Sequence, residues 1–193
     1  MHENCEFIHL FPPLICKFTY DFDYQSINPR IIELFRLVQE NSKLEAGDAL
    51  STVSLPERLQ PHTWIEFKDF QTKLGLILDE VKKEYKFVDK RSVVKQSWIN
   101  RHGIDGQTLE HSHNATTFAV AAYLKCPPNS GNIVFRDPLE YHKHSFPIYP
   151  EESNFKEVPV KTNDVLIFPG WLKHHVKPNK SQEERLVLTL NIQ

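Results

Sequence analysis

The sequence has few of the features that mark secreted, membrane or disulfide-linked proteins. Its three cysteines, Cys5, Cys16 and Cys126, form no CxxC pair and leave one thiol over. This usage favours a reducing cytosol over a disulfide framework. No segment approaches the roughly 20 apolar residues of a membrane span, and the N-terminal stretch lacks the basic start and unbroken apolar run of a signal peptide. We therefore expect a cytoplasmic protein that contacts no membrane.

A bias toward one sign of charge is also missing. The chain has 23 basic and 25 acidic residues, a formal net charge of −2, and no basic block or stripe. Nothing in this distribution indicates a nucleic-acid partner. Hydrophobic residues make up 40% and charged residues 25% of the chain, which is ordinary for a globular protein. We expect residues 1–193 to form a single domain.

Helical patterns are confined to residues 1–88. After a short strand interrupted by Pro12-Pro13, Asn28 suits the N-cap and Pro29 the first position of one helix. A second helix is predicted over about residues 61–87. Its apolar residues recur at steps of three and four: Trp64, Phe67, Phe70, Leu74, Ile77, Leu78 and Val81.

Residues 89–193 predict short strands with turns between them. Runs rich in Val, Ile, Thr, Phe and Tyr alternate with turn signals: SVVKQSWIN, TTFAVAAYL, IVFRDP, KEVPV, DVLIFP, KHHVKP and RLVLTLNI. Many short strands at close spacing indicate a sandwich or barrel, and helices followed by strands indicate an α+β fold with the helices on one sheet. A jelly roll is the expected core, and the long loop 138–157 is expected to cross its mouth.

The stretch LEHSHN places His111 and His113 two residues apart. Residues i and i+2 of a strand point to the same face, so two inward imidazoles there would form half of a metal site. Solvated surface histidines are the competing interpretation. A second pair, His142 and His144, lies in a loop rich in proline and tyrosine, where that interpretation is the stronger one.

The C-terminal stretch DVLIFPGWLKHHVKPN supplies a third candidate. A buried-strand pattern is followed by His174 or His175 at the start of the next strand. Arg185 begins the last strand and would suit a carboxylate, which a guanidinium binds through two parallel hydrogen bonds. The alternative is a surface arginine paired with Glu183 or Glu184.

Six short motifs carry a resemblance to a known family. They are W-x-N at 98–100, HSH at 111–113, AYL at 122–124, GNIVFRDP at 131–138, FPGWLKHHVKPN at 168–179 and ERLVLTLNI at 184–192. In this order they resemble the Fe(II)- and 2-oxoglutarate-dependent oxygenases, in the prolyl-hydroxylase-like branch and among its small bacterial and phage members. The opening LFPPLI followed by a helix also fits, so the resemblance covers nearly the whole chain. It implies a double-stranded β-helix, a jelly-roll form, with N-terminal helices supporting one sheet.

The resemblance also implies an iron site. His111 matches the first iron ligand, and His174 matches the distal histidine of a W-L-x-H-x-V pattern, which leaves His175 pointing away from the metal. His113 is taken as the third ligand, although most of the superfamily has an aspartate or glutamate there. The alternatives for completing the metal shell are Glu110, Asp137 or a water.

For the cosubstrate, the resemblance implies a set of residues that bind the distal carboxylate. Arg185 matches the arginine that pairs with the distal carboxylate of 2-oxoglutarate, and Tyr123 matches a tyrosine that shares it. Asn100 is a weaker candidate for a contact with cosubstrate or substrate. Val187 stands where many relatives have serine or threonine, so Tyr123 would have to supply that hydrogen bond.

The implied function is an Fe(II)- and 2-oxoglutarate-dependent dioxygenase that uses O2 to hydroxylate a C–H bond, with succinate and CO2 as co-products. No catalytic residue beyond the metal ligands is expected. The substrate would be a small molecule, a peptide or a protein, for example a peptidyl proline, in the cytosol of a bacterium or of a phage-infected host. Four aromatic residues would keep water from the metal, although each is equally well explained as part of the core: Trp171, Phe118, Phe135 and Phe168.

Three other functions would use the same histidines. A zinc hydrase or hydrolase would need three histidines and an open fourth position, but it leaves Arg185 and Tyr123 without a role. A cupin-type dioxygenase would use three histidines without a cosubstrate. A non-catalytic jelly-roll binding module would not depend on the metal at all.

Overall fold

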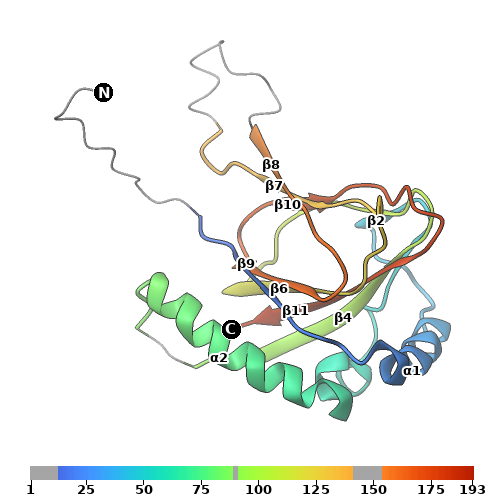
Figure 1. The fold of residues 1–193 in the computed structure, drawn as a ribbon, viewed down its shortest axis with the longest axis horizontal. Helices are drawn as coiled ribbons and strands as arrows, with labels where there is room; N and C mark the ends of the chain where they lie inside the picture. Colours follow the sequence, from blue (N-terminus) through green and yellow to red (C-terminus); the bar gives the residue numbers. More distant parts are fainter. Residues whose placement is uncertain (1–12, 89–90, 141–153) are drawn as a thin grey trace.

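The computed structural model describes residues 13–88, 91–140 and 154–193, and its core is a pair of antiparallel sheets (Figure 1). The six-stranded sheet has the order β1 (Cys16–Thr19), β9 (Asp164–Pro169), β6 (Phe118–Lys125), β11 (Arg185–Ile192), β4 (Val94–His102) and β3 (Ala49–Ser51). The five-stranded sheet has the order β2 (Glu45–Ala46), β5 (Gln107–His111), β10 (His174–Val176), β7 (Ile133–Arg136) and β8 (Phe155–Val158). From β4 to β11 the chain passes repeatedly between the sheets, which confirms the predicted jelly-roll core.

Two α-helices, α1 (Tyr24–Arg36) and α2 (Lys68–Glu84), cover the outer face of the six-stranded sheet (Figure 1). The apolar face of each helix packs against outward side chains of the strands in one buried cluster. Burying a large apolar side chain contributes about 1.5–3 kcal/mol, so this cluster holds the helices to the sheet as predicted. None of the described helices has the length and apolarity needed to cross a bilayer.

The predicted helix boundaries are partly wrong. The first helix begins at Tyr24 rather than Pro29, because Asp23 caps it by accepting a hydrogen bond from the Ser26 amide (3.3 Å). Asn28 instead accepts a hydrogen bond from the Tyr24 hydroxyl within the helix (2.8 Å). The predicted start of the second helix forms two 3-10 turns, Pro61–Thr63 and Ile65–Phe67, after an earlier turn at Glu57–Leu59; regular α-helix begins only at Lys68.

Strands β2 and β3 were not predicted from the sequence. They form a short arm that pairs with both sheets, β2 with β5 and β3 with β4. The bend between them packs backbone to backbone on the turn between β4 and β5. A Cβ on Gly47 (φ 69°) would lie 2.3 Å from the Asp105 carbonyl oxygen, and a Cβ on Gly106 would lie 2.3 Å from the Asp48 carbonyl oxygen. Glycine is therefore required at both positions for the arm to reach the mouth of the barrel.

Some predictions fall outside the described residues. These are the start of the N-terminal strand region, most of the loop 138–157, and with it the pair His142 and His144.

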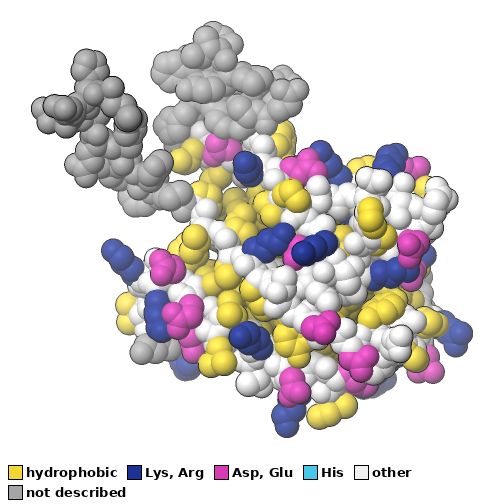
Figure 2. All heavy atoms as spheres, viewed as in Figure 1, with side chains coloured by type: hydrophobic (Ala, Val, Ile, Leu, Met, Phe, Trp, Pro, Cys, Tyr) yellow, Lys and Arg dark blue, Asp and Glu magenta, His cyan; other side chains and the backbone are white. Residues whose placement is uncertain are grey.

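On the face shown in Figure 2, basic and acidic side chains are interspersed and no continuous basic patch forms.

Candidate active site

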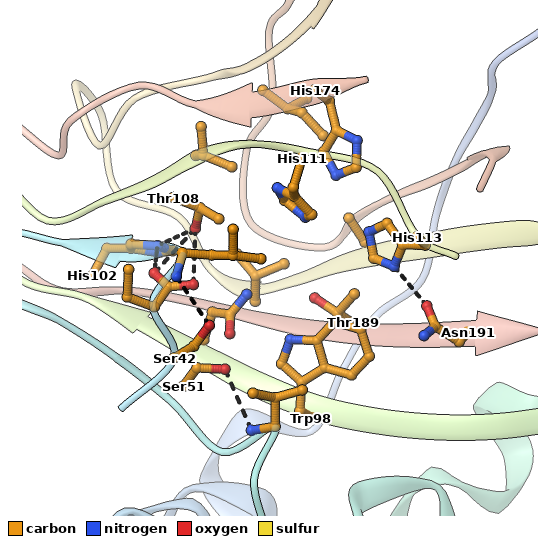
Figure 3. Close-up of a pocket in the computed structure, with 18 of the residues that line it drawn as sticks. Ser42, Ser51, Trp98, His102, Thr108, His111, His113, His174, Thr189 and Asn191 are labelled. Atoms are coloured by element: carbon orange, nitrogen blue, oxygen red, sulfur yellow. Dashed lines mark hydrogen bonds and ion pairs between the residues drawn. The ribbon is translucent and has the colours of Figure 1, made fainter. Parts of the chain in front are cut away.

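Three histidines, two from strands of the five-stranded sheet and one just after the end of β5, meet inside the barrel (Figure 3). His111 is the last residue of β5, His113 follows two residues later, and His174 begins β10 directly opposite His111. The ring centroids are 4.3 Å apart for His111 and His174, 5.1 Å for His111 and His113, and 5.2 Å for His113 and His174. One ring nitrogen from each histidine lies within 4.8 Å of those of the other two. The β5–β10 pairing thus joins residues that are 63 positions apart in the chain (174 − 111).

Each of these imidazoles is oriented by a hydrogen bond from Nδ1. His111 Nδ1 bonds to the Leu109 carbonyl oxygen (2.8 Å), and His174 Nδ1 bonds to the Leu172 carbonyl oxygen (2.9 Å). His113 Nδ1 bonds to Oδ1 of Asn191 (2.6 Å). Because all three partners are acceptors, each Nδ1 carries the proton and each Nε2 keeps its lone pair. This is the usual arrangement behind metal-bound histidines.

Burial keeps these histidines neutral. The pKa of His113 is lowered to about 4 and that of His174 well below its usual value, in both cases first by burial and then also by neighbouring imidazoles. The pKa of His111 is also lowered, first by burial. At neutral pH the cluster therefore offers three unprotonated nitrogens, which suit a divalent transition metal such as iron or zinc.

The two carboxylates proposed as alternative ligands do not join this cluster. Among the described residues, the grouped metal-ligand side chains are the three histidines. Glu110 lies on the opposite side of β5 and pairs with Arg136 (2.9 Å). The Asp137 carboxylate accepts a hydrogen bond from the Leu139 amide (2.9 Å). His113 thus lies where the sequence suggests a third ligand.

A cavity of about 220 Å³ adjoins the histidines between the two sheets (Figure 3). Its walls carry Asn100 from β4 and Tyr123 from β6, as the sequence suggests, together with Val187 from β11. Burial raises the pKa of Tyr123, so its hydroxyl stays protonated and available as a donor. The cavity is smaller than the roughly 300–1,000 Å³ typical of sites that enclose a drug-sized ligand.

Arg185 lies next to Tyr123 but does not line this cavity. Its side chain is fully buried, and Nη1 donates to the Ser130 carbonyl oxygen and to that of Gly131 (2.8 Å). Nε and Nη2 are buried without a partner in the described part of the chain. A buried cation with unpaired donors is costly, so these two donors fit an anionic ligand such as a carboxylate. The alternative of a surface arginine is wrong.

Of the four aromatic residues expected around the metal, Phe118 takes the alternative core position and Trp171 lines a surface pocket with His113. Trp171 is 56% exposed, and Phe118 belongs to the cluster beneath the helices. Phe168 and Phe135 do lie beside His174, at ring-centroid distances of 4.8 and 5.9 Å. The aromatic residue that stacks on the histidine cluster is Trp98, whose ring centroid is 5.8 Å from that of His113.

His175 points away from the cluster. It is half-buried on the other side of β10, where its ring centroid lies 5.9 Å from that of Phe155. Strand alternation therefore separates it from His174.

Three polar residues of the site were missed in the sequence. Asn191 orients His113, and His102 and Glu45 line the far end of the cavity. Alternation could have identified two of them, since Asn191 is six residues after Arg185 and His102 is two residues after Asn100. Glu45 had no such signal, because its strand has only two residues.

Three clustered histidines inside a jelly roll, with a buried arginine on a strand of the opposite sheet, define a metal-dependent enzyme of the double-stranded β-helix class. Comparison with known families gives the same answer. Residues 96–191, about half of the chain, match the model of the family described as "Putative 2OG-Fe(II) oxygenase". The chain belongs to the 2-oxoglutarate- and Fe(II)-dependent oxygenases, enzymes that use Fe(II), 2-oxoglutarate and O2. No curated protein sequence matches the chain significantly.

Solved structures of this superfamily share the fold. The collagen prolyl hydroxylase of Paramecium bursaria Chlorella virus-1, in complex with 2-oxoglutarate, has a TM-score of 0.59 at 14% identity, over 92% of this chain and 94% of that one. HygX from Streptomyces hygroscopicus, with nickel and 2-oxoglutarate bound, has a TM-score of 0.58 at 15% identity, over 93% and 82%. A prolyl-4-hydroxylase from Pseudomonas putida has a TM-score of 0.57 at 9% identity, over 93% and 91%. The fold is thus that of prolyl-hydroxylase-like oxygenases.

Proposed function

We propose that this oxygenase hydroxylates a C–H bond of its substrate at an Fe(II) ion held by Nε2 of His111, His113 and His174, with succinate and CO2 as co-products. The observation that carries the proposal is the three-histidine cluster with every Nδ1 satisfied by an acceptor. Iron and 2-oxoglutarate, when bound, supply the oxidative chemistry. The chain supplies their binding, their orientation and a shielded cavity.

Arg185 and Tyr123 are proposed to hold the distal carboxylate of 2-oxoglutarate. Among the described residues, two buried donors of Arg185 have no partner, and Tyr123 stays protonated beside it. Asn100 lines the same cavity, and its Oδ1 is buried without a partner in the described residues. Its amide group is suited to a contact with the cosubstrate or with the group that reacts.

The proposed substrate presents a protruding group to the metal while most of its bulk stays outside. The cavity of about 220 Å³ must take the cosubstrate and leaves little further volume. An amino-acid side chain of a peptide or protein, such as a prolyl ring, has the required shape, and a small metabolite is the alternative. The fold shared with prolyl hydroxylases supports the first choice. The cysteine usage supports a cytoplasmic setting.

The test is an anaerobic titration of the apoprotein, first with Fe(II) and then with 2-oxoglutarate. We expect the weak visible charge-transfer absorption of a keto acid chelated to Fe(II), its loss in His111→Ala, and its retention in His175→Ala. Iron binding without this absorption would instead indicate a three-histidine enzyme that uses no 2-oxoglutarate. Failure to bind a metal would leave a non-catalytic jelly roll.

A further inference from the structure

A buried acid–imidazole pair lies at the end of the cavity away from the histidine cluster. The Glu45 carboxylate accepts a hydrogen bond from His102 Nε2 (3.0 Å), and the Thr108 hydroxyl lies 2.9 Å from the same nitrogen and 3.1 Å from the same carboxylate oxygen. The side chains of His102 and Glu45 are 1% and 2% exposed. Both residues line the cavity, and His102 is labelled beside Thr108 in Figure 3.

The arm formed by β2 and β3 fixes this pair. Glu45 is opposite Thr108 in the β2–β5 pairing, and the close contact at Gly47 and Gly106 holds the arm against the barrel. The carboxylate therefore reaches the cavity from outside the core strands. It orients His102 with Nε2 toward Glu45 and leaves Nδ1 buried without a partner in the part of the chain that the structure describes.

The neighbour of His102 on the adjacent strand is Arg185, the arginine proposed to bind the cosubstrate. His102 is directly opposite Arg185 in the β4–β11 pairing, and opposite residues of an antiparallel pair point to the same face. The unpaired donors Nε and Nη2 of Arg185 and the unpaired Nδ1 of His102 thus belong to neighbouring side chains. A ligand that satisfied only the arginine would leave the imidazole nitrogen buried and unpaired.

The charges at this end of the cavity constrain what can bind there. Arg185 and Glu45 carry opposite charges that balance each other, and Arg101, on the same strand as His102, is paired with Asp48 (2.9 Å). Tyr123 is held neutral by burial. A carboxylate added here would leave one net negative charge in a buried space. Its oxygen would also face the lone pair of His102 Nδ1, which is unfavourable.

We propose that the Glu45–His102 pair is a third contact for the distal carboxylate of 2-oxoglutarate, and that the pair takes up one proton as the cosubstrate binds. With that proton, His102 Nδ1 becomes a donor to the carboxylate while Nε2 still donates to Glu45. The buried charges of Arg185, Glu45, the protonated His102 and the ligand carboxylate then sum to zero. This inference rests on the proposed function and adds a pH-dependent step to it.

The electrostatic surroundings agree with this two-state behaviour. In the free protein, burial lowers the pKa of His102, Arg185 and Arg101 lower it further, and Glu45 acts in the opposite direction. The imidazole is therefore neutral before binding. A carboxylate at Nδ1 raises the pKa of His102 in the complex. Binding of 2-oxoglutarate is therefore favoured at lower pH, and it weakens as the pH rises from the pKa of His102 in the free protein to its pKa in the complex.

The test is calorimetric titration of the Ni(II)-loaded protein with 2-oxoglutarate, in buffers of different ionisation enthalpy and between about pH 6 and about pH 8. We expect about one proton to be taken up per cosubstrate, and the affinity for 2-oxoglutarate to fall by up to about tenfold per pH unit above the pKa of His102 in the free protein. His102→Gln should bind more weakly at low pH and take up no proton. Glu45→Gln should move the pH dependence to lower pH, while His175→Gln, the same substitution outside the cavity, should leave it unchanged.

The outcomes separate this inference from the function on which it rests. Tight binding of 2-oxoglutarate without proton uptake in the unmodified protein, or the same pH dependence in His102→Gln, would overturn the role of the pair alone. No binding of 2-oxoglutarate to the metal-loaded protein would overturn the proposed function as well. The proton count of the unmodified protein decides the matter even if a variant fails to fold.

Discussion

The two faces of the six-stranded sheet are made by the same strands but differ in chemistry. Toward the helices, β11 presents Leu188, which belongs to the larger apolar cluster. Toward the cavity, the next residue, Thr189, lines the wall of the site, two residues before Asn191. Alternation along a strand makes this division automatic. Stability and chemistry are therefore interleaved residue by residue, and neighbouring substitutions should have separable effects.

The five-stranded sheet shows the same division at His174 and His175. His174 faces the cluster, whereas His175 faces outward against Phe155. Because the two side chains differ only in the face of β10 that they occupy, they give the most direct test of the comparison.

The largest effect is expected from His174→Ala. Loss of one of three nitrogen ligands should abolish measurable Fe(II) binding, whereas His175→Ala should bind Fe(II) as the unmodified protein does. Anaerobic metal titration of both variants checks this prediction. The opposite result would mean that His175 is the ligand and that the side chains of β10 point to the opposite faces, with His175 inward and His174 outward.

The next largest effect is expected from Arg185→Ala. Truncating one partner of a buried charge pair costs roughly 2–5 kcal/mol, so the apparent KM for 2-oxoglutarate should rise by about 30-fold or more, with Fe(II) affinity nearly unchanged. Succinate formation at varied 2-oxoglutarate measures this. Since Arg185 also binds the Ser130 and Gly131 carbonyl oxygens, Arg185→Lys serves as a variant that keeps the charge. Unaltered 2-oxoglutarate kinetics in both would remove Arg185 from the site.

A smaller effect is expected from Asn191→Ala. It removes the acceptor of His113 Nδ1 and should weaken Fe(II) binding by about 10- to 100-fold, as is typical for partners of metal-bound histidines. Asn191→Asp keeps an acceptor at the same place and should retain or strengthen binding. Competitive metal titration measures both affinities, and equal losses in the two variants would contradict the orienting role.

The smallest effect on the site is expected from Leu188→Ala on the opposite face. The substitution creates a cavity beneath the helices and should lower the free energy of unfolding by about 2–5 kcal/mol. Chemical denaturation measures that loss, and metal titration should give an Fe(II) affinity within about threefold of the unmodified value, because distant sites act nearly independently. A large drop in Fe(II) affinity would show that the two faces are coupled.

Much of the fold could be predicted because local patterns dominate in strands and helices. The strand 164–169 has the predicted bounds, since six consecutive residues are buried there. The start of the first helix could not be predicted from Asn28 and Pro29, because Asp23 offered a competing cap four residues after Thr19 ends β1. Residues 61–67 have helical spacing but form 3-10 turns, in which Trp64 and Phe67 are still buried.

The candidate site could be predicted in part for the same reason. His111, His113, His174 and Arg185 stand at strand ends that their sequence patterns mark, and the family resemblance gave each a role. The positions of Trp171 and Phe118 could not be settled from the sequence, because Trp171 stands in the turn before β10 and Phe118 in a strand buried on both faces. Alternation marks the inward face of Asn191 and His102, but the partners of these residues, and the arrival of Glu45, depend on other strands that no local pattern contains.

The sequence by itself determined the jelly roll, the helices on one sheet, and the residues able to bind a metal and an anion, because alternation and turn chemistry are local properties. Only the tertiary structure decided which nitrogen of each histidine is free and which donors of Arg185 lack partners. It also decided that a two-residue strand far from the core strands delivers a carboxylate to His102. Hydrogen-bond partners and buried charge balance depend on the packing of segments remote in sequence, and packing is settled only when the chain is folded.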